Sequence, residues 1–88
     1  MIVNLSKKIV NRLITSEQIR AARALIKWSA DDLAKAAGVG VATIRRFESV
    51  PGVPGGQMRV IELIRKTLEA SGVEFIGSPD DRPGVRIK

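Results

Sequence analysis

Four stretches of the chain carry apolar residues at the spacing of a one-sided helix. In the first, Ile19, Ala22 and Ile26 follow one another at i, i+3 and i+7. The predicted helices cover, in order, residues 17–27, 30–37, 41–48 and 57–70. Ser16 is the predicted N-cap of the first helix, and Ser29 that of the second.

The pattern changes after residue 72. Residues 73–76 and 85–88 are short, largely alternating and rich in β-branched side chains, which is typical of strands. Between them, residues 77–84 contain two prolines and two glycines, and they predict an eight-residue hairpin loop. An isolated hairpin is only marginally stable in water, so these strands must pack on the helices or on a second copy of the chain.

Together these elements predict one mainly α domain, a bundle of four to five short helices with a C-terminal β-hairpin. We expect residues 1–15 to form a basic N-terminal arm, ordered or half-ordered, and residues 16–72 to form the helical domain. Residues 73–88 form the hairpin and are a candidate dimerisation element, because exposed strand edges pair readily with other strands.

Charge adds a candidate partner. The 88 residues carry a formal charge of +6, and residues 1–28 hold six basic side chains against Glu17 alone. Arg20, Arg23 and Lys27 share one face of the first predicted helix. This concentration favours a polyanion, with nucleic acid preferred over a membrane surface. The alternative is that the basic residues only keep the surface soluble.

The inventory of side chains argues against several classes of function. The chain has no histidine, cysteine or tyrosine, so we expect no metal site, no cofactor, no disulfide and no histidine-based catalytic triad. We therefore expect that the protein is not an enzyme. Apolar runs are far shorter than the roughly 20 residues that cross a bilayer, and no secretory signal is visible, which predicts a cytoplasmic protein without a membrane partner.

The segment from Ser29 to Ser49 is the most informative. Two short helices joined by a tight turn at Gly38 must cross steeply, and small residues at 34 and 37 allow close contact. Four apolar residues are spaced to meet in the angle between the helices: Leu33, Val39, Ile44 and Phe47. The second helix then presents to solvent a face without an acid before Glu48. Such a rod fits the major groove of B-DNA.

This segment resembles the helix-turn-helix of phage Cro and repressor proteins, the XRE family. The resemblance covers residues 16–71. It is carried by the Trp28-Ser29 junction, the Leu-Ala-x-x-Ala-Gly-Val run at 33–39 and the Ile-x-x-Phe-Glu ending at 44–48. It implies a sequence-specific transcriptional repressor or regulator that binds duplex DNA through the helix over residues 41–48. Because one such helix buries limited surface, a homodimer on two half-sites is expected.

Carried over position by position, the resemblance implies two sets of contacts. Base edges would be contacted by Val41, Ala42, Thr43 and Arg46. The DNA backbone would be contacted by Ser29, Ala30, Gly40 and Arg45, and the basic face of the first helix adds Arg20, Arg23 and Lys27.

Three positions depart from the family pattern. Ala30 stands where the family often has glutamine, Gly40 where a capping hydroxyl is usual, and Val41 with Ala42 where polar readers are common. Recognition is therefore expected to depend more on the shape of the DNA.

The alternative function is a protein-interaction module, such as an antitoxin that binds a toxin or another co-regulator.

Overall fold

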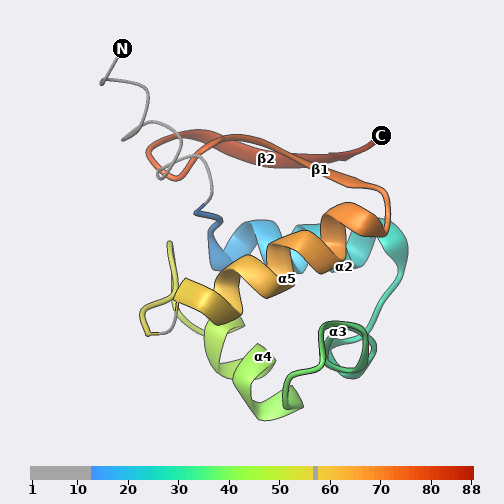
Figure 1. The fold of residues 1–88 in the computed structure, drawn as a ribbon. Helices are drawn as coiled ribbons and strands as arrows, with labels where there is room; N and C mark the ends of the chain where they lie inside the picture. The colour runs from blue at the N-terminus through green and yellow to red at the C-terminus, as the bar shows by residue number, and fades with distance from the viewer. Residues whose placement is uncertain (1–12, 57) are drawn as a thin grey trace.

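The computed structural model describes residues 13–56 and 58–88. Within these residues the chain forms four short helices followed by a two-stranded antiparallel hairpin (Figure 1). The elements are α2 (Ser16–Ile26), α3 (Ala30–Ala37), α4 (Val41–Glu48), α5 (Met58–Ala70), β1 (Val73–Ser78) and β2 (Asp81–Ile87). The mainly α fold and the four predicted helices are confirmed. Residues 1–12 of the predicted basic arm lie outside the described residues, and so does Gln57.

The N-cap of α2 differs from the prediction by one residue. Thr15, not Ser16, caps the helix, and its hydroxyl accepts the Gln18 N–H at 3.0 Å. In return, the Gln18 amide oxygen accepts the Thr15 N–H at 2.8 Å. This reciprocal pair is a capping box. Ser16 is already helical and buried, and its hydroxyl donates to the Val50 carbonyl.

The elements stack in three layers. Helices α2 and α5 lie in the middle, with the hairpin across one side of them and α3 with α4 on the other (Figure 1). The core lies where the layers meet and is built almost entirely from aliphatic side chains. Its fully buried members include Ile14, Ile19, Leu33, Ile44, Ile61, Ile64, Leu68 and Val73.

The hairpin is longer and its turn tighter than predicted. Strand pairing runs from Val73 with Ile87 to Ser78 with Asp81, so the predicted eight-residue loop is wrong. The register shifts at Gly77, whose φ is +74°. A Cβ at that position would lie 2.2 Å from the carbonyl oxygen of Arg82. Only glycine fits this bulge, which lets pairing continue through residues that resemble a loop in sequence.

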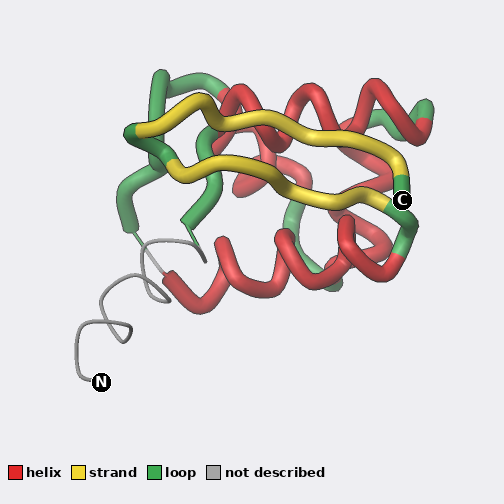
Figure 2. Tube along the Cα trace, turned by 90° about the horizontal axis from the view of Figure 1, so that it is seen from above, coloured by secondary structure: helices red, strands yellow, loops and turns green. Residues whose placement is uncertain are grey.

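The helices supply the support that the hairpin needs. Val73 is fully buried in the core, and Phe75 and Val85 pack against it. The buried Gln18 side chain donates to the carbonyls of Ile76, at 3.3 Å, and Gly84, at 2.9 Å. The hairpin crosses above the helices along its length (Figure 2). It is therefore an integral layer of the domain.

Candidate nucleic-acid interface

The turn between α3 and α4 forms as predicted. Ser29 caps α3, its hydroxyl accepting the Asp32 N–H at 3.0 Å, while the Asp32 carboxylate accepts the Ser29 N–H at 2.9 Å. The helix ends at Gly38, which has a left-handed φ of +73°. The N–H groups of Gly38 and Val39 both donate to the Ala34 carbonyl, closing the helix end in the manner that such glycines permit.

The angle between α3 and α4 is fixed by packing. Leu33, Ile44 and Phe47 are buried in one cluster with Ala34, and Val39 packs against it. These are the residues predicted to meet there. Because well-packed interiors resist deformation, α4 is held as a rigid element on the surface of the domain.

An ion pair also ties α4 to α2. The Arg23 guanidinium donates to both carboxylate oxygens of Glu48, at 2.7 and 2.6 Å, and to the Trp28 carbonyl at 3.0 Å. The hydrogen bond to Glu48 raises the pKa of Arg23. The two side chains are only 20% and 9% exposed. Arg20 donates to the Glu48 backbone carbonyl, so a second cation holds the end of α4.

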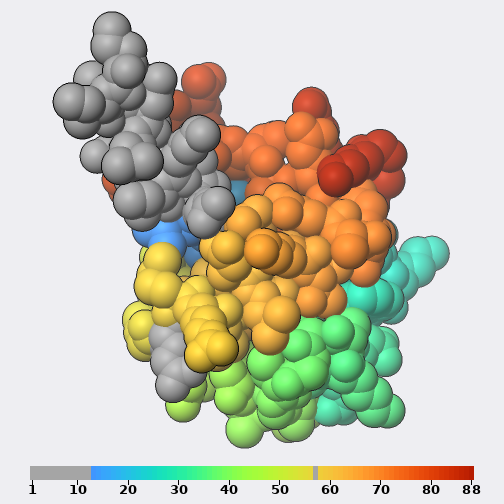
Figure 3. Space-filling model, in the orientation of Figure 1, coloured from blue at the N-terminus to red at the C-terminus, as the bar shows by residue number. Residues whose placement is uncertain are grey.

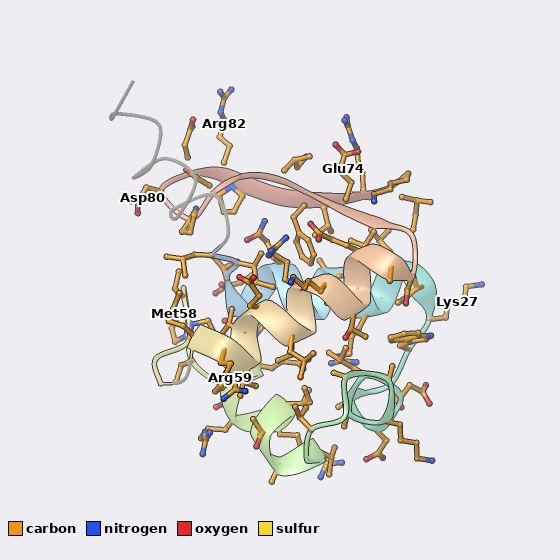
Figure 4. All side chains as sticks on the ribbon, viewed as in Figure 1. Lys27, Met58, Arg59, Glu74, Asp80 and Arg82 are labelled. Atoms are coloured by element: carbon orange, nitrogen blue, oxygen red, sulfur yellow. The ribbon has the colours of Figure 1, made fainter. Side chains whose placement is uncertain are left out.

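The three residues of the predicted basic face of α2, namely Arg20, Arg23 and Lys27, therefore make different contacts. All three guanidinium nitrogens of Arg23 donate inside the protein, which removes it from the candidate phosphate contacts. Lys27 adopts the left-handed conformation at the end of α2 and its side chain points outward, away from α4 (Figure 4). Sequence reasoning missed the internal role of Arg23 because its partner is 25 residues away.

The exposed side of α4 is narrower than predicted. Ala42, Arg45 and Arg46 are exposed, whereas Val41 and Thr43 are half-buried and Val41 packs against the core. We call Ala42, Arg45 and Arg46 the outer face of α4. In the space-filling view α4 lies at the end of the molecule away from the hairpin (Figure 3).

The charge of this outer face is wholly positive. Neither Arg45 nor Arg46 forms an ion pair within residues 13–56 and 58–88. The Arg46 guanidinium carbon lies 5.4 Å from the ring centroid of Phe47, a cation–π distance. Glu48, the one acid of α4, is neutralised by Arg23. The face thus offers two guanidinium groups and a methyl group.

The start of α3 is less suited to phosphate than predicted, whereas the start of α4 is open. The Asp32 carboxylate occupies the start of α3, and the N–H of Ser29 lowers its pKa. Ala30 is half-buried and packs against the core. Gly40 is exposed at the start of α4, and no side chain caps that helix.

Groups that could support metal chemistry are absent from the part of the chain that the structure describes: it brings together no set of three or more metal-ligating side chains. None of the helices described is long and apolar enough to cross a membrane.

No protein-family model and no curated protein sequence matches this chain.

Proposed function

We propose that the protein binds duplex DNA by inserting the outer face of α4 into the major groove, and that it regulates transcription as a repressor by occluding a promoter. The observation that carries the proposal is the charge of α4. Its one acid is neutralised within the fold, and Arg45 and Arg46 remain exposed on a rigid rod. An α-helix fits the major groove, and arginine can pair with guanine through two hydrogen bonds.

The three-layer arrangement is compatible with this docking. The hairpin lies on the side of α2 and α5 opposite α3 and α4, so it does not cover the outer face of α4 (Figures 1 and 3). Because α4 has only eight residues, the proposal includes a homodimer that places two copies on adjacent half-sites. It also includes a cytoplasmic location, where such a protein meets its DNA.

Selection of bound sequences from a random duplex pool, followed by fluorescence anisotropy on the selected duplex, tests the proposal. Arg46→Ala should cost about 1–3 kcal/mol at one base pair and relax the preference there. Arg45→Ala should weaken selected and random duplexes alike and reduce the slope of log affinity against log salt by about 0.9.

Arg82→Ala is the matched control, because it removes the same charge from the hairpin side of the molecule (Figure 4). It should leave affinity for the selected duplex unchanged. If the wild-type protein binds no duplex in dilute buffer, or if all three variants behave alike, the proposal is wrong.

A second candidate, an antitoxin-type module that binds a partner protein, is favoured by a different surface. Met58 and Leu63 on α5 are 51% and 42% exposed, and they line an open hollow together with Arg59, Glu62 and Lys66. Exposed apolar patches of this kind suit protein contacts. A partner retained at fixed stoichiometry by the wild type and lost in Leu63→Asp, with DNA affinity unchanged, would support this function.

A further inference from the structure

We infer that the first turn of α4 recognises the 5-methyl group of a pyrimidine in the major groove. This inference rests on the proposed DNA binding and names the chemistry that the site reads. It starts from the side chains that the first turn exposes. Val41 and Thr43 are half-buried at the flanks of the helix, and Val41 packs against the core. Ala42 is exposed between them.

The groups around Ala42 leave little else for direct recognition. Gly40, at the N-cap, has no side chain that could bond a base edge, and the first turn holds no acid. The Ala42 methyl group neither donates nor accepts hydrogen bonds. Among the base edges in the major groove, the thymine 5-methyl group is the apolar feature, and 5-methylcytosine carries the same group. The exposed side chain of this turn therefore makes an apolar contact.

The position of Arg46 adds a second requirement on the DNA sequence, next to the methyl-bearing pyrimidine. Arg46 follows Ala42 by four residues, a rise of about 6 Å along the helix. For a helix that follows the groove, this spans roughly two base-pair steps of about 3.4 Å each. The Arg46 guanidinium, beside the Phe47 ring, can pair with guanine. The half-site should thus combine a methyl-bearing pyrimidine with a guanine within about two base pairs.

The test changes single atoms of the DNA. In the selected duplex, each thymine is replaced in turn by uracil, which removes only the methyl group. At one thymine per half-site, uracil should weaken binding about fourfold, the value expected from one buried methyl group. At the same position, a 5-methylcytosine–guanine pair should bind more tightly than a cytosine–guanine pair by a similar factor.

A protein variant links the effect to Ala42. Ala42→Gly should bind thymine- and uracil-containing duplexes equally, whereas Ala24→Gly should discriminate like the wild type. Ala24 is an exposed helical alanine on α2, so it matches the cost of glycine in a helix. Thermal denaturation checks that both variants fold, and Ala42→Ser, which should also discriminate less, replaces Ala42→Gly if that variant does not.

The outcomes separate this inference from the proposed function. The inference is overturned if uracil has no effect at any thymine, if the selected half-site contains no thymine, or if Ala42→Gly still discriminates. Sequence-specific DNA binding stands in each of those cases. If the protein binds no duplex at low salt, both fall.

Discussion

At the scale of single residues, Arg23 and Glu48 form a polar contact that ties α4 to α2. Two helices far apart in sequence meet through two hydrogen bonds between a guanidinium and a carboxylate. The pair is largely removed from water, so its members depend on each other. Loss of the arginine would leave a shielded carboxylate without its partner, which is costly.

Arg23→Ala should lower the free energy of unfolding by roughly 2 kcal/mol for this reason. The matched control is Arg86→Ala, which breaks a similar pair with Glu74 on the outside of the hairpin, where the two side chains are far more exposed. That change should cost at most about 1 kcal/mol. Urea denaturation followed by circular dichroism measures both. Equal losses in the two variants would contradict a special role for Arg23.

Of these residue-level features, the cap of α2 could be predicted from the sequence, whereas the Arg23–Glu48 pair could not. Thr15 and Gln18 have the spacing of a capping box, a local signal that favours Thr15 over Ser16 as the N-cap. The pairing of Arg23 with Glu48 has no such local signal. Arginines on one face of a predicted helix appear as a free basic stripe, and only the fold decides which of them turns inward.

At the scale of elements, carboxylates that accept backbone N–H groups stabilise the starts of two helices, α2 and α3. Asp32 accepts the N–H of Ser29 at the start of α3. At the start of α2, Glu17 accepts the N–H of Gly52 from the loop after α4. The hydrogen bond from the Ser29 N–H lowers the pKa of Asp32. The pKa of Glu17 is also lowered, first by its own backbone N–H and then by that of Gly52.

A pH dependence of stability follows from these directions. A carboxyl group with a lowered pKa in the folded state binds protons more weakly than in the unfolded chain. Its contribution is therefore complete above the ordinary carboxyl pKa of about 4 and is lost as the pH falls through the folded-state value. The urea concentration at the midpoint of unfolding should decrease as the pH is lowered from about 5 to about 2.5. Asp32→Asn should flatten this decline.

Asp31→Asn provides the control, since it removes the same charge from the same turn without touching the bonds to Ser29. It should leave the acid decline close to that of the wild type. A decline equally flattened by both substitutions would mean that charge near the start of α3, and not the cap, is responsible.

The elements also differ in how well sequence predicts them. The bounds of α3 could be predicted because a capping serine marks its start and a left-handed glycine its end. The start of α4 could be predicted because it follows that glycine after only two residues, Val39 and Gly40. The hairpin strands could be located, but not their ends. Residues such as Gly77 and Pro83 favour a loop locally, and the bulge at Gly77 instead keeps them within paired strands. Cross-strand pairing outweighs the local preference there.

At the scale of the whole molecule, α4 and the hairpin lie on opposite sides of α2 and α5 (Figure 1). The hairpin obtains its support from α2 and α5 within one chain. Deleting residues 73–88 would remove Val73 from the core, so it would damage the fold as well as any dimer. A test of the proposed dimer must instead change an exposed side chain of the hairpin.

Ile87, which is 52% exposed on β2, is suited to this test. If the dimer forms through the hairpin, Ile87→Asp should weaken it at least tenfold in sedimentation equilibrium, because the change places a charge in an apolar contact. The melting temperature of the Ile87→Asp variant, measured at low protein concentration, should stay close to that of the wild type. Met58→Asp, at a similarly exposed position on α5, should leave the assembly unchanged; the opposite pattern would move the interface to α5.

The burial of Val73 has a consequence for the way the protein is made. The core is completed by residues near the C-terminus, and Gln18 near the other end of the domain finds two of its hydrogen-bond partners on the same late segment. A nascent chain on the ribosome therefore cannot finish folding this domain until the hairpin has left the exit tunnel. A message that stops after α5 yields a polypeptide that retains all four helices in sequence but exposes their interior to proteases.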